Sequence, residues 1–264
     1  MPKTFINGID LHYNIYGSGA PIILVHGLGM DQGMWDLQAP EFSRNYQVIV
    51  YDLRGHGQSE SPDYSYSIDL FADDLHHFLR YLGLKKSAAL GLSLGGRIVL
   101  RFALKYPEEI RALLLADAQS ETPEESKQRF GELVEVVRRQ GMGPAAEVFF
   151  SWPLLQRFAQ LNPERFQKEK ARFAKSSAVG FIHSCLAIAQ MEPLTGRLGE
   201  IKAPTLALAG EKDEPFLPYL DIYSRRIPSC KNLTIPRAGH LSNLENPQAF
   251  NQAVLSFLSG LANP

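Results

Sequence analysis

Short apolar runs alternate with longer amphipathic stretches along most of this chain, and no other feature of the sequence constrains its fold as strongly. The apolar runs at residues 21–25 and 48–51 are too short for helices and apolar on both faces, as buried parallel strands must be. The stretch after Ser67 has apolar residues at helical spacing, and the serine is placed to cap it. This alternation predicts an α/β fold, in which a mostly parallel central sheet carries helices on both faces.

The alternation locates individual strands and helices outside the middle of the chain. The strands are expected near residues 4–7, 11–16, 21–25, 48–51, 87–90, 113–116, 205–209 and 232–235. The helices are expected near residues 36–44, 68–82, 94–106, 217–226 and 246–258. Asn7-Gly8 between the first two strands is a strong hairpin signal, so the sheet should begin antiparallel.

Residues 119–199 break this rhythm. Helix-like stretches follow one another there without a strand pattern, at residues 124–140, 145–151, 163–175 and 178–191. At roughly 150 residues per domain, a chain of 264 residues is short for two domains. We therefore expect one α/β core, formed by residues 1–118 and 200–264, with residues 119–199 inserted after the sixth strand as a helical cap.

The charge balance argues against several classes of function. Lys and Arg together number 27 and Asp and Glu 28, so the net charge of −1 favours neither nucleic acid nor an anionic membrane as a partner. No apolar run approaches the roughly 20 residues of a membrane span, and the first residues do not resemble a signal peptide. We expect a cytoplasmic protein, a monomer or homodimer, whose partner is a small molecule.

No cofactor or metal is expected. The two cysteines, Cys185 and Cys230, are expected to be buried free thiols, and no Cys or His pair has a spacing suited to zinc. The turn at residues 27–29 lacks the third glycine of a dinucleotide fingerprint because Gln32 occupies that place, and no Walker lysine is present.

The strongest chemical signal is Gly91-Leu92-Ser93-Leu94-Gly95-Gly96, between a buried strand and a helix. In this context G-x-S-x-G is a nucleophile elbow, in which a sharp turn exposes the serine hydroxyl. The turn strains the serine backbone, and glycines on both sides let strand and helix approach without Cβ collisions. A glycine-rich turn that merely packs closely is the alternative, but the position after a buried strand favours Ser93 as a nucleophile.

A serine hydroxyl needs a positioned base, and that base needs an acid to hold its tautomer and stabilise its charge. Asp213 follows the strand at residues 205–209, and His240 follows the strand at residues 232–235. Both therefore lie at the sheet edge where Ser93 emerges and where open α/β sheets bind ligands. We predict a catalytic triad of Ser93, His240 and Asp213. The other histidines are expected to be structural: His12, His26, His56, His76, His77 and His183.

The same chemistry needs two backbone N–H groups that bind an oxyanion, one after the nucleophile and one from a loop after an earlier strand. Leu94 directly follows Ser93, and Leu28 lies in the turn His26-Gly27-Leu28-Gly29 after the strand at residues 21–25. We assign the N–H groups of Leu28 and Leu94 to an oxyanion hole. The alternative is that this turn is only a tight connection.

Taken together, these motifs resemble those of the α/β-hydrolase-fold serine hydrolases along nearly the whole chain. They are His26-Gly27-Leu28-Gly29, Asp52-Leu53-Arg54-Gly55-His56-Gly57-Gln58-Ser59, Gly91-Leu92-Ser93-Leu94-Gly95-Gly96, Gly210-Glu211-Lys212-Asp213 and Gly239-His240. Residues 91–96 and 240–245 also resemble the branch of small carboxylesterases and 3-oxoadipate enol-lactonases. The resemblance implies that the cap roofs the active site. It leaves a second candidate acid, because some relatives take it from the position of Asp117; we prefer Asp213.

The cap suggests the kind of substrate. Its aromatic residues are Phe130, Phe149, Phe150, Trp152, Phe158, Phe173 and Phe181. Most should pack between helices, but Trp152, at an apparent break between helices, is our candidate for the substrate pocket. We expect hydrolysis of small to medium, largely apolar carboxylic esters through an acyl-enzyme on Ser93.

Two alternatives to this function remain open. An enol-lactonase or C–C bond hydrolase acting on acidic ring-cleavage products would need a cation near the cleft to hold the carboxylate. A non-catalytic receptor on the same fold would be marked by the loss of a triad member, and none is lost here.

Overall fold

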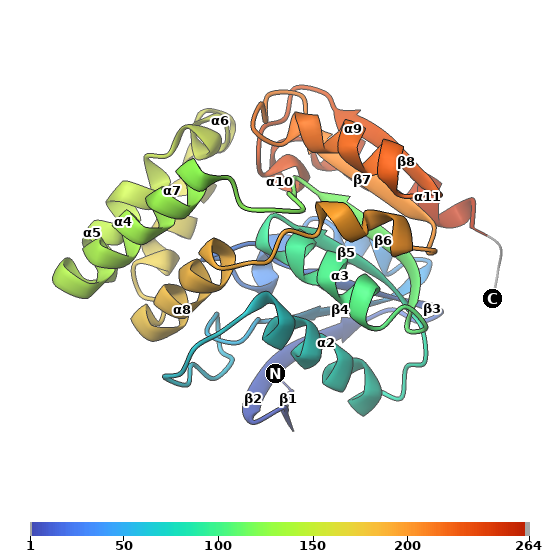
Figure 1. The fold of residues 1–264 in the computed structure, drawn as a ribbon, viewed down its shortest axis with the longest axis horizontal. Coiled ribbons are helices and arrows are strands. Elements are labelled where there is room, and N and C mark those ends of the chain that lie inside the picture. The colour runs from blue at the N-terminus through green and yellow to red at the C-terminus, as the bar shows by residue number, and fades with distance from the viewer. Residues whose placement is uncertain (1, 262–264) are drawn as a thin grey trace.

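The computed structural model describes residues 2–261, and its centre is one sheet of eight strands in the order β1-β2-β4-β3-β5-β6-β7-β8 (Figure 1). The strands are β1 (Lys3–Ile6), β2 (Ile9–Tyr16), β3 (Ala20–Val25), β4 (Tyr46–Tyr51), β5 (Ser87–Leu92), β6 (Ile110–Ala116), β7 (Thr205–Gly210) and β8 (Cys230–Ile235). β2 pairs antiparallel with β1 and β4, and all other neighbours are parallel. The predicted sheet, including its antiparallel start, is confirmed.

The strand order reverses beside β3, because the chain passes from β3 outward to β4 and then returns to the other side of β3 as β5. Val25 at the end of β3 is paired with Gly91 near the end of β5. Loops that leave two parallel strands in opposite directions open a crevice at their carboxyl ends, where ligands bind in such sheets. The turn at Leu28 and the turn at Ser93 therefore face the same crevice.

Helices cover both faces of the sheet. These elements are η1 (Gln32–Trp35), α1 (Ala39–Phe42), α2 (Ile68–Tyr81), α3 (Leu94–Lys105), η2 (Thr195–Glu200), α9 (Leu217–Arg226), α10 (Ser242–Glu245) and α11 (Pro247–Ser259). α2 packs on α3, and η2 contacts both α3 and α9, whereas α1 packs on α11. The expected helix at residues 36–44 is wrong. Only Ala39–Phe42 of this range is an α-helix, because Pro40 lacks an N–H and is tolerated only in the first turn of a helix.

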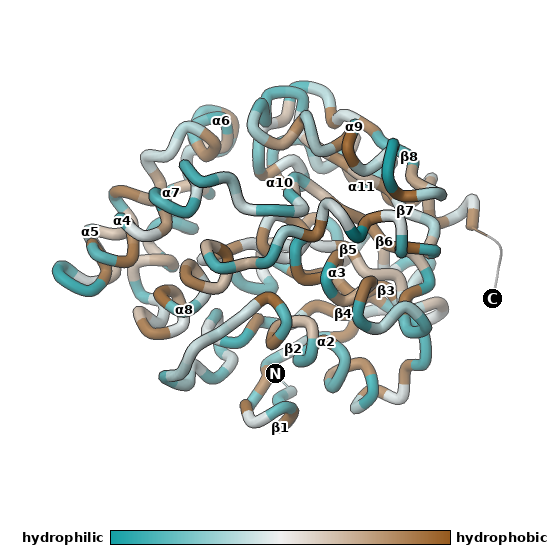
Figure 2. The backbone as a smooth tube through the Cα atoms, viewed as in Figure 1, coloured by the Kyte–Doolittle hydropathy of each residue, from teal (hydrophilic) through white to brown (hydrophobic). Residues whose placement is uncertain are grey.

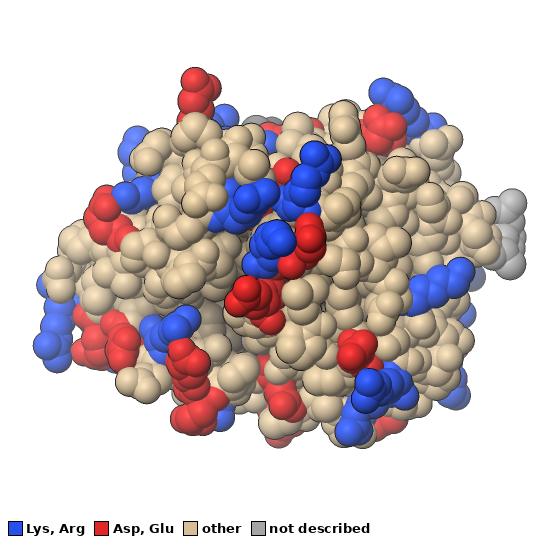
Figure 3. Space-filling view, turned by 90° about the horizontal axis from the view of Figure 1, so that it is seen from above, with Lys and Arg blue, Asp and Glu red and all other residues tan. Residues whose placement is uncertain are grey.

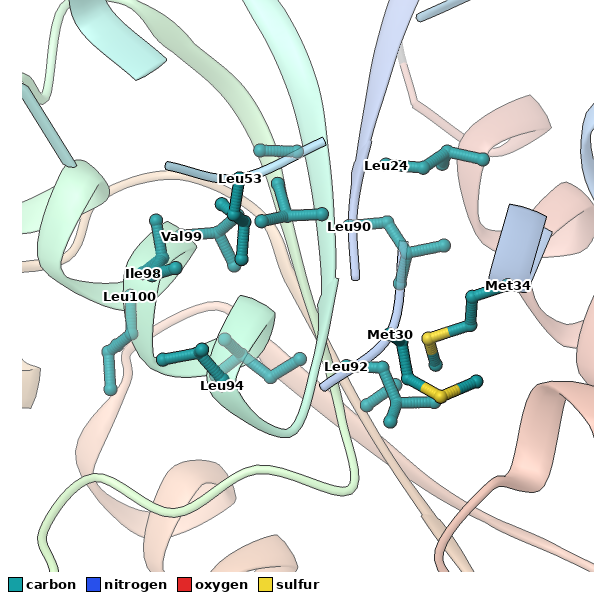
Figure 4. Packing of buried hydrophobic residues seen from close by; sticks show 14 of the residues in the cluster. Leu24, Met30, Met34, Leu53, Leu90, Leu92, Leu94, Ile98, Val99 and Leu100 are labelled. Atoms are coloured by element: carbon teal, nitrogen blue, oxygen red, sulfur yellow. The ribbon is translucent and has the colours of Figure 1, made fainter. Parts of the chain in front are cut away.

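The strands and the inner faces of the helices form the apolar core, whereas hydrophilic residues gather on turns and outer helix faces (Figure 2). Leu92 of β5 packs beside Met30 and Met34, and on the other side of the strand Leu53 lies beside Val99 of α3 (Figure 4). All these side chains are buried. The core thus surrounds the β5–α3 turn and holds it rigidly.

Five helices lie between β6 and β7 and gather beside the sheet (Figure 1). They are α4 (Glu124–Gln140), α5 (Met142–Phe150), α6 (Pro153–Leu161), α7 (Pro163–Phe173) and α8 (Ala178–Ala189), here called the inserted helices. α6 was not expected; Pro153 begins it, directly after the apparent break at Trp152. Phenylalanine rings pack these helices together, with Phe149 stacked on Phe173 at a centroid distance of 5.1 Å.

The inserted helices are also fastened to the core. Arg165 of α7 bonds to Asp36 at 2.7 Å, and Arg172 of α7 pairs with Asp31. Gly180 in the first turn of α8 packs so closely on Gly55 that a Cβ there would collide with the Gly55 backbone. These three contacts lie on the loops that follow β3 and β4, so the inserted helices are positioned over the crevice.

Positive and negative side chains are interspersed on the face seen in Figure 3, without a large patch of one sign. Within residues 2–261, no helix combines the length and the apolar character needed to cross a bilayer.

Candidate active site

Ser93 occupies the sharp turn between β5 and α3. Its φ of +56° and ψ of −113° place a non-glycine residue in a sparsely populated backbone region. A Cβ at Gly91 would collide with the carbonyl of Gly95, and one at Gly95 would collide with the carbonyl of Val25. Only glycine permits this approach of strand and helix, and the turn carries the Ser93 side chain at its tip.

Ser93, His240 and Asp213 come together at the carboxyl ends of three strands. His240 Nε2 lies 3.1 Å from Ser93 Oγ, and His240 Nδ1 lies 2.9 Å from Asp213 Oδ2. His240 is 5% exposed and Asp213 1% exposed, so water competes little for these bonds. Asp213 accepts the Nδ1–H, which leaves Nε2 free to accept the serine proton. Phe216 covers the imidazole with its ring centroid 4.4 Å away.

A carboxylate that the sequence analysis missed holds the loop of His240. Glu245 accepts the N–H of Gly239 at 2.6 Å and the N–H of Leu241 at 3.1 Å, one on each side of the histidine. Burial raises the pKa of Glu245, while the two N–H donors act in the opposite direction. Its position five residues after His240 is the signal that could have identified it.

The N–H groups of Leu28 and Leu94 border the same space. Leu94 is the first residue of α3, and neither N–H has an acceptor within the described part of the chain. The turn that carries Leu28 is fixed by His26, whose Nδ1 donates to the carbonyl of Gly27 at 2.8 Å and whose Nε2 accepts the N–H of Leu53 at 3.0 Å. Burial lowers the pKa of His26, which fits this neutral tautomer. The arrangement leaves two N–H donors for an anionic oxygen.

Asp117, the other candidate acid, does not reach His240. It follows β6, its Oδ1 accepts the N–H of Gly210 at 2.8 Å, and its Oδ2 is bonded to the hydroxyl of Ser242. Of the two carboxylates considered, Asp213 is the one placed on the imidazole.

A cavity of about 120 Å³ opens over Ser93 between the core and the inserted helices. Its walls are mostly apolar. They include Leu28, Met30, Phe130, Phe149, Trp152 and Phe158. Trp152, the predicted pocket residue, lies in this wall with its ring 5.0 Å from that of Phe149 and 5.7 Å from that of Phe130. The cavity suits an apolar group of modest size.

Two arginines line the cavity, Arg97 and Arg129, and the sequence analysis identified neither. Arg129 is paired with Glu125 at 2.6 Å, so Arg97 is the one considered further. Arg97 is in the second turn of α3 and is only 5% exposed. Its guanidinium donates to Gln119 Oε1 at 2.7 Å, Thr122 Oγ1 at 2.9 Å and the Glu121 carbonyl at 3.1 Å. All these acceptors are neutral, and burial lowers the pKa of Arg97 to about 10. Its positive charge therefore has no carboxylate partner among the described residues.

Within residues 2–261, no group of three or more His, Cys, Asp or Glu side chains could hold a metal ion. Cys185 is buried and Cys230 is half-buried, and both are free thiols.

The chain was compared with known proteins. The family model for the alpha/beta hydrolase fold matches residues 20–247. The chain is 31% identical over 253 residues to 3-oxoadipate enol-lactonase 2 of Acinetobacter baylyi, which covers 93% of this chain and 92% of that protein.

Solved structures agree in fold. A malate-bound esterase from Thermogutta terrifontis has a TM-score of 0.91 and 31% identity, with 100% of both chains covered. The enol-lactonase from Burkholderia xenovorans has a TM-score of 0.90 and 27% identity, covering 98% of this chain and 100% of that chain.

Proposed function

Because the chain belongs to the α/β-hydrolase-fold family, we propose that it is a serine hydrolase that cleaves carboxylic esters through an acyl-enzyme on Ser93. Family membership confirms the resemblance inferred from the motifs. The enol-lactonases and esterases among its relatives confirm the prediction of a carboxylic ester hydrolase. The observation that carries the proposed mechanism is the chain of hydrogen bonds from Asp213 through His240 to Ser93.

In the proposed mechanism, His240 Nε2 takes the proton of the Ser93 hydroxyl as its oxygen attacks the ester carbonyl. Asp213 holds the imidazole by its Nδ1–H and stabilises the imidazolium. The N–H groups of Leu28 and Leu94 bind the oxyanion of the tetrahedral intermediate. His240 then protonates the departing alcohol, and a water molecule activated by the same imidazole hydrolyses the acyl-enzyme.

The cavity walls support a small to medium, largely apolar substrate. Phe130, Phe149 and Trp152 come from the inserted helices, and the turns of Ser93 and Leu28 come from the core. We assign residues 119–199 the role of a cap that shapes the substrate pocket, and residues 1–118 and 200–264 the role of the catalytic core.

A second candidate is favoured by Arg97. A guanidinium that lines the cavity without a carboxylate partner could bind the carboxylate of an acidic ester or lactone. That is the cation which an enol-lactonase or a C–C bond hydrolase of ring-cleavage products would need. The apolar ester remains the first proposal because most of the wall is apolar.

Ser93→Ala tests the reaction. Loss of the nucleophile should lower turnover of p-nitrophenyl butyrate on the order of 10⁶-fold, the loss measured for the nucleophile of a serine protease. A fluorophosphonate probe should label the parent at Ser93 and leave the folded variant unlabelled. Labelling at another residue, or undiminished hydrolysis by the variant, would contradict the proposal, and no turnover or labelling of the parent would favour the non-catalytic receptor.

A matched pair of substrates separates the two candidates. p-Nitrophenyl butyrate and mono-p-nitrophenyl succinate differ by a carboxylate in place of a methyl group. If Arg97 binds a carboxylate, Arg97→Gln should lower kcat/KM for the succinate ester about 10- to 100-fold, because a hydrogen bond to a charged group contributes a free energy of this size. The kcat/KM for the butyrate ester should be nearly unchanged. An equal change for both esters would reject the second candidate.

The remaining expectations belong to the same proposal. The protein acts in the cytoplasm without a cofactor, on a small molecule, as a monomer or homodimer. Cell fractionation and sedimentation analysis of the purified protein test the location and the oligomeric state.

A further inference from the structure

Asp117 is a buried carboxyl group that the proposed mechanism does not use. It is 0% exposed and follows β6 with a φ of +46°. Its Oδ1 accepts the N–H of Gly210 at 2.8 Å, and its Oδ2 is bonded to the hydroxyl of Ser242 in α10. Among residues 2–261 no Lys, Arg or His forms an ion pair with it. A carboxylate this deeply buried normally has a cation beside it.

The neighbour of Asp117 is another carboxylate, Asp213. Gly210 joins the two residues, because its N–H bonds to Asp117 and its carbonyl accepts the N–H of Asp213 at 3.0 Å. The carboxylate of Asp213 is close enough for its charge to raise the pKa of Asp117. Asp213 uses Oδ2 for the imidazole of His240, whereas its Oδ1 is buried and has no donor within the described chain. One donor is therefore missing at Asp213 Oδ1, and Asp117, which would be a donor if protonated, is bonded to the same Gly210.

Two ionised carboxylates in contact and away from water repel each other, so such a pair holds one proton. The surroundings decide which carboxyl carries it. Asp213 Oδ2 already accepts the Nδ1–H of His240, and the carboxyl of Glu245 bonds to the backbone on each side of that histidine. Among the described residues, the Asp117 carboxyl bonds only to the N–H of Gly210 and the hydroxyl of Ser242, and the negative charge of Asp213 acts on it. Ionisation is thus favoured on Asp213 and disfavoured on Asp117.

We propose that Asp117 is a neutral carboxylic acid at pH 7 and that its O–H donates to Asp213 Oδ1. Asp117 then acts as a positioning residue: it engages the free oxygen of Asp213, fixes the plane of that carboxylate and leaves its charge directed at His240. Burial first, and the charge of Asp213 second, raise the pKa of Asp117 well above its ordinary value. The catalytic consequence rests on the proposed function, but the location of the proton does not.

The proton changes how stability depends on pH. The unfolded chain releases the Asp117 proton above about pH 4, the ordinary aspartate value, whereas the folded chain keeps it. A carboxyl whose pKa is raised by folding stabilises the protein below that ordinary value and loses this contribution as pH rises. Relative to a variant without this group, the unfolding equilibrium constant should therefore rise tenfold for each pH unit above the ordinary value, until the raised pKa of the folded chain is reached.

Urea unfolding at pH 5, 6, 7 and 8 tests where the proton is. The parent is compared with Asp117→Asn, whose amide can accept a hydrogen bond from Gly210 and donate one to Asp213. Asp221→Asn is the matched control, because the Asp221 side chain is 71% exposed. The unfolding constant of the parent, divided by that of Asp117→Asn, should rise about tenfold per pH unit. The unfolding constant of the parent, divided by that of Asp221→Asn, should not change with pH. If Asp117→Asn does not fold, Asp117→Ser also removes the titrating group and serves in its place. A flat ratio for the folded Asp117 variant would overturn the proposal.

Ester hydrolysis tests the positioning role. Asp117→Asn retains a donor to Asp213, so its kcat should stay within about tenfold of the parent value. Asp117→Ala lacks this donor, so its kcat should be at least about tenfold below that of Asp117→Asn, while KM changes little. Equal kcat values in the two variants would reject the positioning role while leaving the Ser93→Ala result intact. Failure of the proposed function would instead appear as hydrolysis that persists in Ser93→Ala.

Discussion

The core and the inserted helices border the same cavity, but different kinds of contact hold them in place. On the core side, the turn of Ser93 is fixed by backbone collisions that only glycine avoids, and His240 is held by buried hydrogen bonds at 3.1 and 2.9 Å. On the other side, α8 has one comparable glycine contact, Gly180 on Gly55, but α7 is fastened by ion pairs at the rim, such as Arg165 with Asp36, whose side chain is 55% exposed. An ion pair that exposed contributes well under about 1 kcal/mol.

The difference follows from what each side does. Misplacing a reacting group by about 1 Å can cost on the order of 100-fold in rate, so the reacting groups need backbone and buried contacts to hold them. A wall only has to exclude water and fit a shape. Phe149 and Trp152 do this by packing on neighbouring rings, an arrangement that tolerates change. Substitutions on the core side should therefore abolish activity, and substitutions in the inserted helices should alter selectivity or stability.

The largest expected effect after Ser93 lies on the core side. Asp213→Asn keeps the shape of the side chain but favours the wrong imidazole tautomer, so turnover should fall about 10⁴-fold, as in a serine protease. Steady-state kinetics with p-nitrophenyl butyrate, on protein shown to be folded by circular dichroism, measures this loss. If instead Asp117→Asn were the crippled variant and Asp213→Asn stayed within about tenfold of the parent, the acid would be Asp117.

Trp152→Ala should have an intermediate effect, on selectivity. Trp152 borders the cavity, and each methylene in an apolar pocket discriminates by about 1–3 kcal/mol, so the ratio of kcat/KM between long and short acyl esters should shift about tenfold or more. Leu161→Ala is the control, because Leu161 is in α6 but 42% exposed, and it should leave the ratio unchanged. A uniform change for all chain lengths would mean that Trp152 only packs the inserted helices.

The smallest expected effect is a gain in stability. Gly131 is an exposed residue inside α4, and a Cβ there would meet nothing within 4 Å. Gly131→Ala should raise the free energy of unfolding by about 0.5–1 kcal/mol, because alanine loses less backbone entropy in a helix. Gly95→Ala on the core side should have the opposite result and disrupt the elbow. Urea unfolding of both variants measures the contrast, and a destabilised Gly131→Ala would show that α4 needs this glycine.

The sequence was most informative where chemistry demands a residue type at a fixed place. Ser93 and His240 could be located because each follows a strand, and parallel strands bring their carboxyl ends to one edge. The mostly parallel sheet followed from the apolar runs, whereas its strand order and switch point came only from the structure. The helix expected at residues 36–44 was wrong at its start, because a helix that contains Pro40 can begin only in the turn at that proline, as Ala39–Phe42 does.

Arg97 could not be predicted, because what distinguishes it is a spatial property. In the sequence, Arg97 is a basic residue within an amphipathic helix, and the charged group of such a side chain usually extends to solvent. Only the folded chain shows that its acceptors, the side chains of Gln119 and Thr122 among them, are all neutral. The Oδ1 of Asp213, which has no donor among the described residues, could not be predicted for the same reason. Its surroundings, which include Asp117, come from three loops that lie far apart in the sequence.

The backbone of Ser93 has a consequence for how this protein can evolve. A serine at a φ of +56° and ψ of −113° costs on the order of 1–3 kcal/mol, whereas glycine adopts such conformations easily. Folded proteins are stable by only about 5–15 kcal/mol, so this strain is a notable fraction of the total. Selection for thermal resistance alone would therefore favour glycine at the one position where it removes the nucleophile, and directed evolution of this chain has to select for turnover at every round.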